Sequence, residues 1–435
     1  MKKLLYLAAA LIISAGAATM ALWPADDIGT ASSTSALTPS EKVARGAYLA
    51  RAGDCMTCHT SRSGAPYAGG RVLPTPFGNI ISPNITSDRE HGIGSWSVEN
   101  FWHALHNGQG KDGHLLYPAF PYTNYTKIGR DDVDALYAFL QTVPANKQAN
   151  RAHELRFPYN LQLALSAWRA LYFRPAVFHA ESSKSIEWNR GAYLVQGLGH
   201  CSACHSSRNP LGASADTLSG GMIPIQGWYA PSLTSDTEAG LGLWQSSHIV
   251  ALLKSGVSPR ATVFGPMAEV VQASLQYMST EDVTAMALYL KTLPGTQAEQ
   301  ALQQTRAQEQ QAKRTDATTG NARQRIQAGA KLYQTWCAKC HQADGRGNAP
   351  AYPPLAGNNA LTMEQAVNPI RIVLNGGFAP GTMDNPRPYG MPAFGPLLSD
   401  REVADVVSYL RASWGNHAPS VSSSDVNRYR SVPLD

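Results

Sequence analysis

The pattern Cys-x-x-Cys-His occurs three times in this chain, and its three copies contain all six cysteines. The copies comprise Cys55, Cys58 and His59, then Cys201, Cys204 and His205, and finally Cys337, Cys340 and His341. No thiol is therefore left over for a framework of structural disulfides. Any chemistry of these cysteines must involve three separate pairs, each followed by its own histidine.

Each copy lies inside a longer repeated unit. The first two units open with Arg-Gly-Ala-Tyr-Leu at residues 45–49 and 190–194, and the third opens with Gly-Ala-Lys-Leu at 329–332. Every unit closes with a valine and a leucine seven residues apart, which are two helical turns apart on one buried face. These pairs are Val133 and Leu140, Val283 and Leu290, and Val403 and Leu410. We predict that the first and last helices of each unit cross at the opening glycine, where a missing side chain lets two backbones approach.

The motif itself indicates covalent haem attachment. Two cysteines at this spacing can form thioether bonds to the two vinyl groups of one haem, and the adjacent histidine then ligates the iron. A zinc site would pair two such motifs, but these lie well over a hundred residues apart. A thioredoxin-like redox site would need a surrounding βαβ pattern, and none is visible. A proline carbonyl is expected to accept the other ring N–H of each histidine, and the candidates are Pro83, Pro231 and Pro354.

The sixth iron ligand is expected to be methionine in the second and third units. Met267 and Met391 each lie in a loop ahead of the closing helix, and a thioether ligand there would raise the reduction potential. Met278 is a competing candidate in the second unit.

The first unit departs from this pattern, because Phe120 occupies the matching position and phenylalanine cannot bind iron. His91, His103, His106 and His114 are available instead. Aligning the units through Asn107-Gly108, Ser255-Gly256 and Asn375-Gly376 places His106 opposite Lys254 and Leu374, so we favour His106 as the ligand. His114 or an open iron remains an alternative, as does a purely structural role for His106. We expect the first haem to have a lower potential than the other two.

The N-terminus carries a targeting signal. Lys2 and Lys3 precede an uncharged stretch from Leu4 to Trp23. About 20 apolar residues can span a bilayer, whereas a signal peptide would be cleaved at a small-residue site. We favour an uncleaved anchor. Either interpretation places the rest of the chain outside the cytoplasm. The net charge is a mild +5 and no dense basic patch is present, so nucleic acid is excluded as a partner.

The whole chain resembles the trihaem cytochrome c subunits of membrane-bound periplasmic dehydrogenases, which oxidise alcohols, gluconate, fructose or aldehydes. The motifs that carry the resemblance are Arg-Gly-Ala-Tyr-Leu at 45–49, Ser-Pro-Asn-Ile-Thr at 82–86, Leu-Tyr-Pro-Ala at 116–119, Ala-Pro-Ser-Leu-Thr at 230–234 and Gly-Met-Pro-Ala-Phe at 390–394. The resemblance implies an all-α fold of three tandem cytochrome c domains, each wrapped around one covalent haem, after the N-terminal signal or anchor. The segments are a signal or anchor at 1–24, the three domains at 38–145, 187–295 and 323–415, a helical connector at 146–186, a linker at 296–322 and a tail at 416–435. We expect the connector to be packed from Leu161 to Phe173 and the serine-rich tail to be loosely ordered.

The resemblance also implies a role in electron transfer. A catalytic subunit on another chain, of molybdopterin, quinoprotein or flavin type, would supply electrons, and this chain would pass them to ubiquinone or another membrane acceptor. Phe120 is more similar to the cytochromes that accompany molybdopterin aldehyde dehydrogenases, and it rules out a methionine ligand carried over from the other relatives. No catalytic motif is visible in the chain itself. Two alternatives stay open, namely a haem peroxidase that uses an open first haem and a cytochrome subunit of a terminal oxidase.

Overall fold

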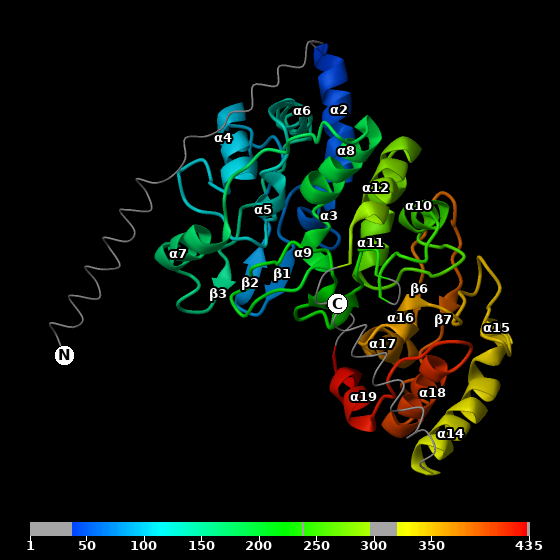
Figure 1. Ribbon diagram of the computed structural model, residues 1–435. Helices are drawn as coiled ribbons and strands as arrows, with labels where there is room; N and C mark the ends of the chain where they lie inside the picture. Colours follow the sequence, from blue (N-terminus) through cyan, green and yellow to red (C-terminus); the bar gives the residue numbers. More distant parts are fainter. Residues whose placement is uncertain (1–36, 237–238, 296–319, 433–435) are drawn as a thin grey trace. The chain divides into compact units, whose positions relative to one another are not determined.

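The computed structural model describes residues 37–236, 239–295 and 320–432, and these form two compact units (Figure 1). The first holds the chain up to Ala50 together with Cys58–Ala180, and the second holds Arg51–Thr57 together with Glu181 onward. The expected signal or anchor at 1–24 and most of the expected linker lie outside the described residues. No helix of the described part has both the length and the apolar character needed to span a membrane.

The described chain is mostly helical. The first repeat and the connector contain α2 (Pro39–Ala52), α3 (Cys55–Cys58), α4 (Val98–Trp102), the π-helical turn η1 (His103–Asn107), α5 (Tyr122–Tyr125), α6 (Arg130–Leu140) and α7 (Gln162–Tyr172). The second repeat contains α8 (Ile186–Tyr193), the π-helical turn η2 (Leu194–Leu198), α9 (Ser202–His205), α10 (Ser246–Ser255), α11 (Pro266–Ala273), the short 3₁₀ helix η3 (Leu275–Tyr277) and α12 (Thr280–Thr292). The third repeat and the tail contain α14 (Gly320–Trp336), α15 (Ala338–His341), α16 (Asn359–Thr362), α17 (Val367–Asn375), α18 (Asp400–Ala412) and α19 (Ser423–Arg430).

Three small antiparallel sheets correct the all-α prediction. Strands β1 (Val72–Thr75), β2 (Gly78–Ile81) and β3 (Glu154–Leu155) form one sheet in that order. Strands β4 (Gly221–Ile223) and β5 (Trp228–Ala230) pair in the second repeat, as do β6 (Gly377–Phe378) and β7 (Gly390–Met391) in the third. Strands of two to four residues are too short to produce the alternating apolar pattern by which a strand is recognised in sequence.

The predicted helix crossings are present in all three repeats. Helix α2 crosses α6, α8 crosses α12, and α14 crosses α18, each time at the opening glycine. A Cβ on Gly46, Gly191 or Gly329 would lie 2.6, 2.5 or 2.7 Å from a backbone carbonyl carbon of the closing helix, which belongs to Ala135, Ala285 or Asp405 respectively. Real Cβ atoms do not approach a backbone this closely, so the missing side chain is required for each crossing.

An arginine strengthens the crossing in the first two repeats. Arg45 donates from Nε to Asp132 at 2.6 Å, and Arg190 makes two hydrogen bonds to Asp282 at 2.8 and 2.7 Å. Both carboxylates lie in the first turn of the closing helix, where a negative charge is also favoured by the helix dipole. The third repeat uses a different pair. Arg325 lies about one helical turn before the position that matches Arg45 and Arg190, and it donates to Asp405 at 3.2 Å.

The second and third repeats share one compact unit. Asn368 accepts a hydrogen bond from the backbone N–H of Tyr229 at 2.9 Å and donates to the carbonyl of the same residue at 2.8 Å. Asn359 donates to the carbonyl of Gly240 at 2.5 Å. The division into three domains with the stated boundaries stays a prediction.

The described part of the C-terminal tail, residues 416–432, is not loosely ordered, contrary to expectation. Helix α19 begins at an N-cap, Ser422, whose hydroxyl accepts from the backbone N–H of Asp425, while the Asp425 carboxylate accepts from Ser422 in return. Val426 on this helix is fully buried in the core of the third repeat. The serines that suggested disorder include a helix cap, so composition alone was misleading here.

Candidate haem-binding sites

The cysteine pairs lie on or beside short helical turns, and none of the six cysteines forms a disulfide within the described residues. Cys55 and Cys58 begin and end α3, while Cys201 and Cys337 are the N-cap residues of α9 and α15. Burial raises the pKa of Cys201 to about 12 and that of Cys337 to about 11. A redox-active thiol needs a lowered pKa, so these environments argue against a thioredoxin-like role.

A backbone carbonyl fixes each motif histidine. The Nδ1–H of His59 donates to the Pro83 carbonyl at 2.8 Å, and that of His205 donates to the Pro231 carbonyl at 2.7 Å. His341 donates from Nδ1 at 3.0 Å to the carbonyl of Pro353, not of Pro354 as expected. Two prolines are adjacent in the third repeat, and the sequence does not show which carbonyl faces the ring.

This contact sets the chemistry of each imidazole. A carbonyl oxygen can only accept, so Nδ1 carries the proton and the lone pair stays on Nε2, the nitrogen available to a metal. Burial lowers the pKa of His59, His205 and His341, although the proline carbonyls partly offset this. All three rings are therefore neutral at pH 7, oriented and able to ligate, as an axial ligand of haem iron must be.

The second repeat has a further set of groups that suits a haem. Trp228 Nε1, Arg260 Nε and Thr262 Oγ1 are buried and have no hydrogen-bond partner within the part of the chain that the structure describes. A buried donor without a partner costs roughly 1–3 kcal/mol, so such groups are rare in folded proteins. Haem carries two carboxylate groups, which are acceptors, so this donor set fits the cofactor. These donors do not recur at matching positions of the three units, so no repeated signal pointed to them.

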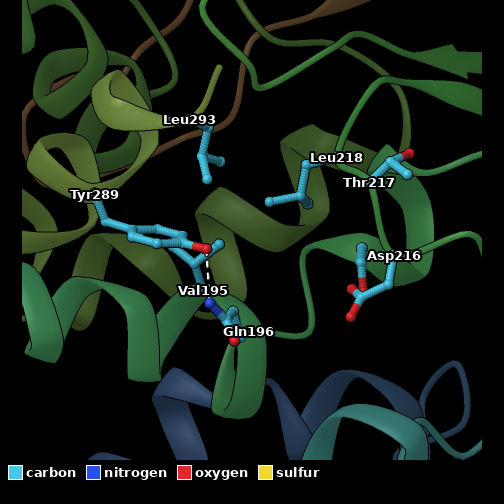
Figure 2. A pocket seen from close by; sticks show the side chains of 8 residues that line it. Val195, Gln196, Asp216, Thr217, Leu218, Tyr289 and Leu293 are labelled. Atoms are coloured by element: carbon cyan, nitrogen blue, oxygen red, sulfur yellow. Dashed lines mark hydrogen bonds between the residues drawn. The ribbon is translucent and has the colours of Figure 1, made fainter. Parts of the chain in front are cut away.

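A cavity of about 250 Å³ lies beside the second motif (Figure 2). Its lining includes Ser202, between the two cysteines, and Tyr289, whose hydroxyl accepts a hydrogen bond from Gln196 at 2.7 Å. Pockets for drug-sized ligands typically hold about 300–1,000 Å³. The cavity is smaller than that range, so it does not suggest a separate substrate site.

Both expected methionine ligands are half-buried and held by defined backbone structure. Met391 belongs to β7 and pairs with Gly377 of β6, and its side chain packs against the core of the third repeat. Met267 lies in the first turn of α11, after Gly265 in the left-handed region with φ of 58°. The competing Met278 is buried, and its carbonyl accepts from Lys254 at 2.6 Å.

In the first repeat, the four candidate histidines differ sharply in environment. His106 lies in η1, is only 3% exposed, and donates from Nδ1 to the Thr126 carbonyl at 2.9 Å. Its ring also stacks on Trp102 at 4.5 Å. His114 is half exposed and hydrogen-bonds to Asp112. His103 bonds to the side chain of Asn107 at 3.1 Å, and His91 lies 4.0 Å from the carboxylate of Glu90.

His106 thus shares the carbonyl contact of the three motif histidines. The matching residue of the second repeat, Lys254, donates at 2.8 Å to the Gln276 carbonyl, four residues before the closing helix as Thr126 is. The position therefore anchors the segment before the closing helix in both repeats. The structure places His106 where a ligand could be supported, and it brings none of the other three histidines onto a backbone carbonyl in the same way.

Comparison with known proteins agrees with this site chemistry. The family model for cytochrome c matches residues 43–144 and 326–414, which contain the first and third motifs. The cytochrome c subunit of quinone alcohol dehydrogenase from Gluconobacter oxydans is 40% identical over 402 residues, which cover 90% of this chain and 82% of the relative. The gluconate 2-dehydrogenase cytochrome c subunit of Pantoea cypripedii is 39% identical over 89% of both chains. The fructose dehydrogenase cytochrome subunit of Gluconobacter japonicus is 36% identical over 90% of this chain and 84% of the relative. The chain belongs to the family of cytochrome c subunits of such dehydrogenases.

Proposed function

We propose that this chain is the electron-transfer subunit of a membrane-bound dehydrogenase on the periplasmic side of the inner membrane. It carries three covalent haems, receives electrons from a catalytic subunit on another chain, and passes them to ubiquinone or another acceptor of the respiratory chain. The observation that carries this proposal is the same arrangement in all three repeats, namely two cysteines of one Cys-x-x-Cys-His motif beside a neutral histidine fixed by a proline carbonyl. The names of the relatives support the same role.

When bound, each haem supplies an iron that alternates between ferric and ferrous states. The residues of the chain set the potential at which this occurs. His59, His205 and His341, neutral and oriented by proline carbonyls, would each ligate one haem iron. Met267 and Met391 would supply a further ligand to the second and third irons, where a thioether favours a higher potential.

We propose His106 as the sixth ligand of the first haem, supported by its burial and by its contact with the Thr126 carbonyl. His106→Leu introduces the residue found at the matching position of the third repeat, Leu374, which is buried there. The variant should convert one haem from six-coordinate low-spin to high-spin, as seen by electron paramagnetic resonance. His114→Leu is the matched control and should leave the spectrum unchanged. A stability loss with an unchanged spectrum would make His106 structural only.

The catalytic partner is proposed to oxidise an alcohol, an aldehyde or a sugar acid; the names of the relatives support the alcohol and the sugar acid. Because Phe120 stands where other relatives have methionine, we favour an aldehyde-oxidising molybdopterin enzyme as the partner. Affinity purification of the chain from its native membrane tests the proposal, because the cofactor of the co-purifying subunit names the chemistry. Addition of that subunit's substrate should reduce all three haems. A co-purifying copper oxidase, or rapid peroxide turnover by the purified chain alone, would contradict it.

A further inference from the structure

The connector after the first repeat exposes an unusual number of large apolar side chains. Phe157 is 78% exposed, Leu163 71% and Leu171 69%. Together with the exposed Tyr159, Leu161 and Tyr172, these residues form what we call the connector patch. The expectation that this run would be packed is therefore only partly correct, since Leu165 and Phe173 are buried but the residues of the connector patch are not.

The patch belongs to a fixed element. Arg169 on α7 is buried and donates to the carbonyls of Asn107 at 2.5 Å and Gly108 at 3.3 Å. Its guanidinium also lies 5.1 Å from the ring centre of Tyr122. Strand β3, near the start of the connector, pairs with β2, and the ring of Tyr159 packs on Phe77 with 4.6 Å between ring centres. One side of the connector is thus anchored to the first repeat, and the apolar side is displayed in a defined orientation.

Several large exposed apolar side chains close together in the sequence, on an anchored element, point to a site of interaction. Helix α7 has 11 residues, far fewer than the roughly 20 needed to span a bilayer, so it could only lie along a membrane surface. Leucines with flanking aromatic residues are typical of helices that insert shallowly among lipid headgroups.

The charge pattern favours lipid as the occupant. From Leu155 to Ala180 the sequence contains no aspartate or glutamate. Arg156 and Arg174 are exposed at the two ends of the patch. Arginines near a bilayer bind phospholipid phosphates, whereas a carboxylate in the same place would be repelled by anionic lipids.

We propose that the connector patch lies on the surface of an anionic phospholipid bilayer, with Leu163 and Leu171 among the acyl chains and Arg156 and Arg174 at headgroup phosphates. This contact would hold the first repeat at the membrane independently of any N-terminal anchor. The proposal rests on the proposed location of the chain at the membrane, but not on its haem ligation or electron transfer.

Hydrogen–deuterium exchange of the full haem-loaded chain tests the proposal. The chain is compared in detergent, in nanodiscs of phosphatidylcholine alone, and in nanodiscs that also contain phosphatidylglycerol. If residues 1–24 tether the chain, they do so in both kinds of nanodisc, so the readout is exchange within peptides covering 157–173 rather than binding. Exchange there should slow several-fold in the anionic nanodiscs, and less in the neutral ones.

The variant that tests the patch is Leu163→Ser/Leu171→Ser, which should abolish the slowing while leaving the haem spectra and reduction by the partner unchanged. Leu243→Ser/Leu397→Ser is the matched control, since both leucines are 62% exposed but lie in the other unit. Unchanged exchange in all lipids would overturn the proposal. Slowing that appears only when the catalytic subunit is added would also overturn it, by identifying a protein interface. If exchange still slowed in the anionic nanodiscs but the chain failed to transfer electrons, the proposed function would be wrong and the membrane contact of the connector patch would stand.

Discussion

The crossing glycines allow a sharp test of the repeat architecture. In Gly191→Ala, the new Cβ would lie 2.5 Å from the carbonyl carbon of Ala285 and 3.0 Å from the Cβ of Tyr289. Carbon atoms in good contact lie about 3.5–4.0 Å apart, so α8 and α12 must separate by roughly 1 Å. None of these atoms is the mobile end of a side chain, so the strain cannot be relieved by a rotamer change.

Two opposing effects set the magnitude. Overpacking of this kind costs about 1–3 kcal/mol, and alanine recovers about 0.5–1 kcal/mol over glycine within a helix. The net loss in the free energy of unfolding is therefore about 1 kcal/mol, within a range of roughly 0–2.5 kcal/mol, and 1 kcal/mol changes the ratio of folded to unfolded protein by a factor of about 5. In native-state hydrogen exchange, the slowest amides of α12 should exchange faster by the same factor. The slowest amides of the α14–α18 pair should keep their wild-type rates.

Gly381→Ala is the matched control, because a Cβ there would meet no atom within 4 Å and no left-handed backbone conformation is required. It should leave exchange in α12 at the wild-type rate. If Gly191→Ala also exchanged at the wild-type rate, the close crossing of α8 and α12 would not depend on glycine and the reasoning from the repeats would be refuted.

Three further predictions concern the third and second repeats. Met391→Ala should lower the reduction potential of one haem by on the order of 0.1 V, within the roughly 0.8 V that axial ligands span. Met383→Ala, at an exposed methionine, should leave all potentials unchanged in the same redox titration. Arg190→Ala removes both hydrogen bonds to Asp282 and should destabilise the second repeat by about 1–3 kcal/mol in denaturant unfolding, and a variant as stable as wild type would make the pair dispensable. The N-cap serine hydroxyl lowers the pKa of Asp425, so this carboxylate stabilises α19 above its ordinary pKa of about 4, and that contribution is lost as the pH falls through the lowered value. Proteolysis of α19 should therefore increase below about pH 4, and cleavage independent of pH would contradict this.

The sequence was most informative where function depends on short-range spacing. The second cysteine and the histidine of each motif are neighbours in the sequence. The carbonyl contacts of His59 and His205 involve the predicted prolines. The glycine crossings could also be predicted, because three repeats provide three independent observations of one feature.

The parts that were missed depend on three-dimensional packing. The choice of Pro353 over Pro354 depends on how one loop folds against the ring of His341. The repeated arginine before the glycine was visible in two units, yet its pairing with Asp132 or Asp282 links residues about ninety positions apart. The order of the tail required knowing that Val426 finds a core to enter.

The central claim is that each pair of thiols holds its own haem, and mass spectrometry of the intact mature chain measures this directly. The measurement is most informative for the second motif, because the cytochrome c family model matches only the regions of the first and third motifs. We expect a mass increase of three haem groups, with one haem on each peptide that contains Cys55, Cys201 or Cys337. A chain carrying two haems, with unmodified Cys201 and Cys204, would contradict it.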